Sequence, residues 1–191
     1  ISNSGIELLL KVKPVVTDDF AMELSLNYTN NDSEVVATND TGGNISLQEP
    51  RSRNLRVTHI VGERYGALFG TSFVRDGNGA IVHELVNGYP RPKIDNSRKI
   101  LGFGVAPQQI GIGASFRYKS WDASVLVEGK SGGQIYSGTN ATMMGTGAHK
   151  MTIPAGGREA GFVPNGVMED GSPVTISIPQ GQQSAYWGRY N

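Results

Sequence analysis

The sequence contains no cysteine, no long apolar run and no excess of either charge. Without cysteine, the chain can form neither a disulfide framework nor a thiolate metal site. Lys and Arg together number 17 and equal the 17 Asp and Glu residues. This balance argues against a nucleic-acid-binding protein, because such proteins carry a basic excess. No stretch approaches the roughly 18 apolar residues that a membrane-spanning helix requires.

Four segments alternate apolar and polar residues with a period of two, the pattern of strands that have one apolar face. The clearest of them runs from Phe20 to Tyr28. Short polar connections, one around Asp18 and one at Lys119–Ser120, join the strands in pairs and predict two hairpins. The apolar positions of the four segments are Ile6, Leu8, Leu10 and Val12; Phe20, Met22, Leu24, Leu26 and Tyr28; Ile110, Ile112, Ala114, Phe116 and Tyr118; and Trp121, Ala123, Val125 and Val127.

The length of these strands and their aromatic ends suit the wall of an outer-membrane barrel. A strand of about ten residues spans about 33 Å at ~3.3 Å per residue, and when tilted it crosses an apolar band of roughly 25 Å. Aromatic residues stand at strand ends, at Phe20, Tyr28, Tyr118 and Trp121, as in the girdles of such barrels. Hydropathy gives only a weak signal for such strands, because residues facing lipid and lumen alternate.

The connections between strands are unequal, since both hairpin turns are short whereas the remaining segments are long. In outer-membrane barrels, short turns face the periplasm and long loops face outside. We therefore predict an all-β fold that is part of a transmembrane antiparallel β-barrel, with about four strands in two hairpins and long extracellular loops. The hairpins are residues 1–31 and 108–131, and the loops are 32–107 and 132–191.

A soluble extracellular β-sandwich is the alternative, because alternating strands with glycine-rich turns describe it equally well. Such a module would bind carbohydrate. Within 32–107, the Asp76–Gly79 turn predicts a small hairpin between the apolar pieces Ala67–Phe73 and Ala80–Val82. Neither long connection contains a convincing amphipathic helix.

No motif for catalysis or metal binding is complete. His83 begins a segment similar to a zinc-protease helix, but Asn87 stands where the second histidine is needed. Gly129–Ser131 resembles the end of a phosphate-binding loop, but Ser124 occupies the place of the required first glycine. The sequence therefore predicts no catalytic residue, no metal site and no cofactor.

Four stretches, in order along the chain, resemble the SusC/RagA-like TonB-linked outer-membrane transporters. They are Ser2–Leu8, Val61–Val82, Tyr118–Thr139 and Gly166–Pro173. The second contains Gly-rich and Arg-Asp-x-Asn-Gly-like elements, and the third ends in Gly-Gly-Gln-Ile-Tyr-Ser-Gly-Thr. One departure is Ala106–Gly111, where family members often have an Asn-Pro-aromatic entry to the strand.

The resemblance implies a non-enzymatic importer in the bacterial outer membrane that moves glycan oligosaccharides or peptides. It implies a barrel of roughly 22 strands, of which about four lie in this chain, surrounded by outer-membrane lipid. Its partners would be a SusD-like surface lipoprotein and TonB, the latter through an N-terminal part that, with the plug and the signal peptide, we expect upstream of residue 1. No nucleic-acid partner is implied.

The segment 132–191 combines several aromatic residues with few charges, the composition that interface cores favour. We expect Tyr136, Tyr186 and Trp187 to contact a ligand or the partner lipoprotein. In the sandwich alternative the same three rings would stack on sugars. The remaining possibility is that the aromatic residues of this segment pack against one another within it.

Overall fold

The computed structural model describes residues 1–39, 42–47 and 55–190, and the chain divides into two compact units. Unit 1 consists of residues 1–47, 57–68 and 102–135, and unit 2 consists of residues 48–56, 69–101 and 136–191. The fold is predominantly β with antiparallel sheets, to which a few short helices are added. Each unit is described by itself.

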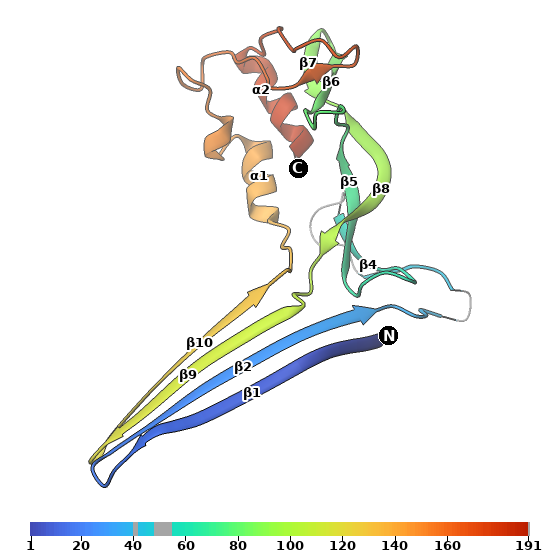
Figure 1. Cartoon of the computed structure of the whole chain (residues 1–191). Helices are drawn as coiled ribbons and strands as arrows, with labels where there is room; N and C mark the ends of the chain where they lie inside the picture. The colour runs from blue at the N-terminus through green and yellow to red at the C-terminus, as the bar shows by residue number, and fades with distance from the viewer. Residues whose placement is uncertain (40–41, 48–54, 191) are drawn as a thin grey trace. The chain divides into compact units, whose positions relative to one another are not determined.

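Unit 1 is built on an open four-stranded antiparallel sheet of order β1-β2-β9-β10 (Figure 1). Its strands are β1 (Ser2–Val16), β2 (Phe20–Glu34), β9 (Gln108–Tyr118) and β10 (Trp121–Ser131). The central pairing joins β2 to β9, whose register places Phe20 opposite Tyr118 and Asn30 opposite Gln108. All four predicted strands are confirmed, as is their pairing into β1–β2 and β9–β10. The described residues form an open sheet and not a closed barrel.

The strand β1 is irregular near its end because it contains Pro14. The register with β2 shifts between Val12, which lies opposite Leu24, and Val15, which lies opposite Met22. Proline has no N–H for the ladder and is tolerated in strands at bulges and edges. Since Leu24 and Met22 lie two residues apart on one face of β2, the bulge keeps Val12 and Val15 on that same face.

The two connections of this sheet are tight. At the first, Thr17 donates its N–H to Phe20 O at 2.7 Å, and its Oγ1 accepts from Phe20 N at 2.9 Å. At the second, Lys119 adopts a positive φ of 52° and donates its N–H to Asp19 O at 2.7 Å. Both turns therefore meet at the same end of the sheet.

In unit 1, a turn at residues 60–66 packs against the end of β2 and the residue that follows it. Val35 is buried and donates its N–H to Glu63 O at 2.9 Å, and Gly62 donates its N–H to Val35 O at 2.8 Å. Arg64 pairs with Asp32 at 3.2 Å, and its guanidinium lies 5.0 Å from the Phe103 ring centroid. These contacts hold the turn at residues 60–66 against the end of β2.

Three further strands and one short strand form a second sheet of order β3-β4-β5-β8. They are β3 (Ile45–Ser46), β4 (Leu55–His59), β5 (Ala67–Phe73) and β8 (Ile94–Phe103). After β5 the chain turns back at residues 76–79, where Arg75 and Ile81 form an antiparallel bridge. Asp76 Oδ1 accepts from the N–H groups of Asn78 and Ala80 at 2.9 and 2.8 Å. The structure thus has a turn at Asp76–Gly79, but the predicted partner strand Ala67–Phe73 pairs as β5 with β4 and β8, and the bridge across the turn is formed by Arg75 and Ile81.

Unit 2 holds a second hairpin that the sequence analysis did not predict. It joins β6 (Val82–Val86) to β7 (Tyr89–Pro92) through Asn87 and Gly88, both at positive φ, and β11 (Val167–Met168) pairs parallel to β6. The resulting sheet has the order β11-β6-β7. Asn-Gly is the strongest short signal for a two-residue hairpin turn.

The sequence shows no convincing amphipathic helix in 132–191, yet the structure has short helices there. This segment forms α1 (Gly138–Thr146), η1 (Lys150–Thr152), α2 (Gln180–Trp187) and η2 (Gly188–Tyr190). Packing between these helices stabilises them, because α1 supplies Met144 and α2 supplies Tyr186 and Trp187 to a buried cluster with Ile178. None of the helices in the described part of the chain is long and apolar enough to cross a membrane.

Candidate functional site

One face of the four-stranded sheet in unit 1 is apolar in register across all four strands. Because partners in neighbouring strands point to the same side, the pairing places Leu10, Leu26, Ile112 and Val127 in one row. The adjacent row toward the turns contains Val12, Leu24, Ala114 and Val125. The alternation predicted for each strand thus becomes one continuous apolar surface.

Aromatic residues form the row at the turn end of this surface. Phe20 lies opposite Tyr118 in β9, and Tyr118 lies opposite Trp121 in β10. Trp121 is the most exposed of them, with 77% of its surface accessible. Amphipathic rings in a row at one end of an apolar strand face are the arrangement of an aromatic girdle at a membrane interface.

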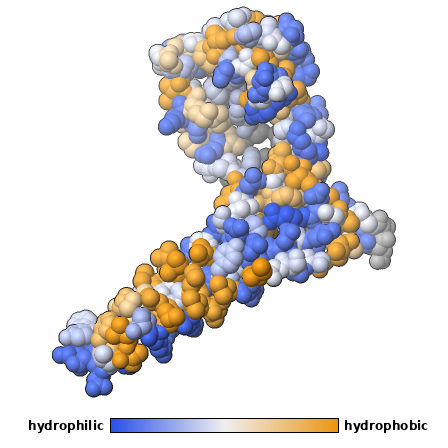
Figure 2. All heavy atoms as spheres, viewed as in Figure 1, coloured by the Kyte–Doolittle hydropathy of each residue, from blue (hydrophilic) through white to orange (hydrophobic). Residues whose placement is uncertain are grey.

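The apolar face carries no second layer of protein in the part of the chain that the structure describes. Leu8, Ile112, Val125 and Val127 are each more than half exposed. Figure 2 shows hydrophobic residues gathered along this sheet. A β-sandwich buries the inner face of each sheet against its partner sheet. Contiguous exposed apolar surface of this kind marks an interaction with a membrane or another protein.

The opposite face is polar. Its rows across the sheet begin with Glu7, Thr29, Gln109 and Lys130, all in register. Further rows hold small, polar and charged residues around Gly111 and Gly113 on β9, together with one leucine on each outer strand, Leu9 on β1 and Leu126 on β10. One face of the sheet is therefore mainly apolar and the other mainly polar. The wall of a membrane β-barrel has the same two faces, one toward lipid and one toward the aqueous interior.

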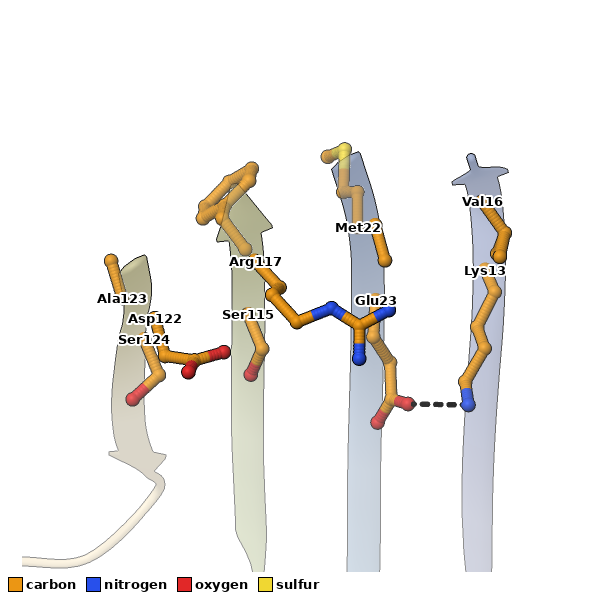
Figure 3. A pocket seen from close by; sticks show the side chains of 11 residues that line it. Lys13, Val16, Met22, Glu23, Ser115, Arg117, Asp122, Ala123 and Ser124 are labelled. Carbon is orange, nitrogen blue, oxygen red and sulfur yellow. Dashed lines mark ion pairs between the residues drawn. The ribbon is translucent and has the colours of Figure 1, made fainter. Parts of the chain in front are cut away.

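Near the turns, the polar face holds a cavity of about 480 Å³ whose charged lining residues alternate in sign (Figure 3). From β1 to β10 they are Lys13, Glu23, Arg117 and Asp122. Lys13 Nζ lies 3.5 Å from Glu23 Oε2, and the Arg117 side chain reaches from β9 toward Glu23. The Lys13 side chain is 67% exposed, so this pair adds little stability. These four side chains present both signs of charge to any polar surface or solute that lies against this face.

The potential metal ligands among the described side chains lie apart from one another. Among them, no three His, Cys, Asp or Glu residues are close enough to hold a metal ion. His83, which begins the zinc-protease-like segment, is fully buried and belongs to the core of unit 2.

The predicted contact residues Tyr186 and Trp187 lie together in the core of unit 2. Their ring centroids are 4.9 Å apart, and both pack on Phe162 at 5.2 and 5.3 Å. Only 4% of Tyr186 and 9% of Trp187 is exposed. In this structure the two rings hold unit 2 together, while their role as a contact to a ligand or partner stays a prediction.

Tyr136 is separate from that core and is 37% exposed. It lines a cavity of about 280 Å³ in unit 2 together with Phe73, Tyr190 and Arg189. The sequence analysis named Phe73 only as the end of an apolar piece, and it named neither Tyr190 nor Arg189. No motif marks this cavity, because its lining comes from distant parts of the chain, at Phe73, at Tyr136 and at the neighbouring residues Arg189 and Tyr190.

The chain is thus a β-rich protein in which one open sheet has an exposed apolar face and a polar face. No protein-family model matches it. It is similar to the TonB-dependent receptor SusC of Bacteroides thetaiotaomicron, with 28% identity over 146 residues. The match covers 71% of this chain and 14% of that receptor, so the chain spans about one seventh of this relative's length. This similarity agrees with the resemblance carried by the sequence stretches.

Proposed function

We propose that this chain is part of the barrel of a TonB-dependent importer in a bacterial outer membrane. The observation that carries the proposal is the sheet of unit 1, whose apolar face is exposed and ends in an aromatic row. Lipid would cover this face, and the polar face would line the interior of the barrel. The similarity to a TonB-dependent receptor supports the same assignment.

Further strands must complete the sheet if it lies in a membrane. In unit 1 the outer edges of β1 and β10 have no strand beside them in the described part of the chain. Each backbone group left without a hydrogen bond in lipid costs several kcal/mol. We propose that strands outside this chain pair with both edges and close the barrel.

The cargo and partners follow from the same proposal. The importer takes up glycan oligosaccharides or peptides, draws energy through TonB, and works with a SusD-like surface lipoprotein. Unit 2 and the long connections lie at the cell exterior, where they contact the lipoprotein or the captured substrate. Among the three predicted contact residues, Tyr136 is the one exposed enough to make such a contact in this structure.

A complementation experiment tests the proposal with two neighbouring substitutions on β2. Leu26 lies in the apolar row and Asn27 on the polar face, opposite Leu9 and Gly111. Cells that lack the full-length protein receive the wild type, Leu26→Arg or Asn27→Arg. The measurements are folded protein in the outer membrane and energy-dependent uptake of labelled oligosaccharides and peptides.

We expect the wild type to restore uptake that a protonophore abolishes. Leu26→Arg should destabilise the assembled barrel by roughly 2–4 kcal/mol, because it places a charge in the lipid. Asn27→Arg should assemble normally. Equal assembly of the two variants would contradict a lipid-facing apolar surface, and unchanged uptake in the absence of the protein would contradict the importer.

A further inference from the structure

The cavity of about 280 Å³ in unit 2 combines aromatic walls with two guanidinium groups. Tyr136, Tyr190 and Phe73 contribute rings, and Arg75 and Arg189 contribute the charges. The remaining lining is apolar or hydroxyl-bearing, and no acidic side chain is among the lining residues that the structure describes. Pockets for small ligands are mostly apolar with a few placed polar groups.

The two arginines differ in how far their charges are already neutralised. Arg189 Nη2 lies 3.1 Å from Glu84 Oε1, so its charge is shared with a carboxylate. Arg75 donates from Nη1 to Gly79 O at 2.6 Å, which is a neutral carbonyl. No ion pair of Arg75 is found with any acidic group in the described ranges. The cavity therefore offers about one unit of uncompensated positive charge.

The aromatic walls are positioned by contacts within unit 2. The rings of Phe73 and Tyr190 meet edge to face with centroids 4.8 Å apart. Tyr190 also packs on Trp187 of the buried cluster, with centroids 5.5 Å apart. Ser72 lines the same cavity, and its Oγ has no hydrogen-bond partner among the described residues. A buried hydroxyl without a partner is uncommon, and a ligand group would satisfy it.

We propose that this cavity binds a unit carrying one carboxylate on a ring-sized body. The carboxylate would accept hydrogen bonds from Arg75, and the apolar face of the body would lie on the rings of Tyr136 and Tyr190. Guanidinium groups match carboxylates in geometry as well as in charge. The volume of about 280 Å³ lies just below the roughly 300–1,000 Å³ of small-molecule pockets, which limits the bound unit to about one ring.

An acidic sugar and the carboxylate end of a peptide share this chemistry, so the experiment uses two probe pairs. Ligand-observed NMR measures the binding of D-glucuronate against D-glucose, and of N-acetyl-L-phenylalanine against its amide. The receptor is the full-length protein in detergent. We expect at least one carboxylate to bind more tightly than its neutral analogue, and the pair that shows the preference identifies the source.

Variants connect the preference to the cavity. Arg75→Gln should weaken binding of the preferred carboxylate about tenfold, because a charge-assisted hydrogen bond is lost. Since Arg75 also holds Gly79 O, the companion variant Arg75→Lys keeps the charge but not the geometry of the guanidinium, and its binding should lie between those of the wild type and Arg75→Gln. Tyr136→Leu, at an exposed residue, should weaken the charged and neutral probes alike. Lys150→Gln removes one exposed positive charge elsewhere in unit 2 and should change nothing.

Two results would overturn the proposal. One is equal binding of both members in each probe pair. The other is a carboxylate preference that survives Arg75→Gln in folded protein, since the anion would then bind elsewhere. Binding in detergent requires neither lipid insertion nor transport, so this outcome is independent of the importer assignment.

Discussion

His83 is fully buried in unit 2, and its contacts define its tautomer. Its Nδ1 lies 3.1 Å from Ile81 O, an acceptor, so Nδ1 carries the proton and donates. Nε2 is then free to accept from the hydroxyl of Tyr186 at 3.3 Å. Burial, with a further contribution from Tyr190, raises the pKa of Tyr186, so this hydroxyl stays protonated and can donate. The pair joins β6 to α2 inside the core.

This environment predicts that unit 2 loses stability in mild acid. Burial lowers the pKa of His83 below its usual 6.5, although the hydrogen bond to Ile81 opposes the shift. The neutral form therefore stabilises the folded state fully above pH 6.5. As the pH falls below 6.5 toward the folded pKa, the unfolded chain binds the proton first, and stability falls by at most about 1.4 kcal/mol per pH unit.

Hydrogen exchange of the β6 and α2 amides at pH 7.5 and 5.5, corrected for intrinsic rates, measures this loss. His83→Gln should remove the dependence below pH 6.5, whereas His149→Gln, at a half-buried histidine, should leave it intact. Equal opening free energies of the wild type at both pH values would contradict the buried neutral imidazole.

At the scale of single elements, the β6–β7 hairpin depends on the backbone of its two-residue turn. Asn87 and Gly88 have φ values of 53° and 81°, the left-handed conformation that such a turn requires. An added Cβ at Gly88 would meet no atom within 4 Å. Any penalty for a substitution there comes from the backbone angle and not from crowding.

Gly88→Ala should therefore destabilise the hairpin by about 1 kcal/mol, the cost of an L residue in the left-handed region. Gly77 offers a matched control, because it lies in the other turn, has open space around its Cα and does not have a positive φ. Gly77→Ala should be neutral or slightly stabilising, since alanine restricts the unfolded chain. Exchange rates of the β6 and β7 amides measure both effects. Similar losses in both variants would show that the turn conformation is not what matters.

For the whole molecule, the importer assignment predicts a sidedness. The tight turns of the unit 1 sheet should face the periplasm, and the Asp76–Gly79 turn should face outside. The chain has no cysteine, so a thiol introduced into it is the chain's only one. Asn78→Cys and Asp18→Cys both place this thiol at an exposed turn position.

A membrane-impermeant thiol reagent applied to whole cells should label Asn78→Cys and spare Asp18→Cys in the full-length protein. After the cells are broken open, both should react, which controls for accessibility. Labelling of Asp18→Cys alone in intact cells would mean that the orientation is inverted. Labelling of neither in intact cells would contradict exposure of the Asp76–Gly79 turn at the surface.

The sequence predicted the elements that depend on neighbours along the chain. The strands β1, β2, β9 and β10 were visible because a half-covered strand alternates every second residue, and this period is local. The turn at Asp76–Gly79 was visible for a similar reason, through residues that favour turn backbones. The Asn87–Gly88 turn carries an equally local signal, because Asn-Gly favours the two-residue turn of a hairpin.

The helices and the cavity depended on contacts between distant residues. The α2 sequence includes Gly181 and has little helical amphipathicity, yet it is helical because its rings pack on Phe162 and Ile178. Tyr136 and Trp187 look alike in the sequence as aromatic residues in a segment of low charge. Only the packing distinguishes them, by placing one at a cavity and the other in the core.

The sequence by itself determined which strands have two faces and which residues lie on each, because alternation fixes sidedness before any partner is present. It did not determine that β2 pairs with β9 across 73 intervening residues, from 35 to 107. That pairing, and with it the single apolar surface over four strands, was decided by tertiary structure. The physical reason is that an apolar surface over four strands requires β2 and β9 to lie side by side with their apolar residues in register. Alternation within each strand does not specify this partner, because the two strands are far apart in the chain.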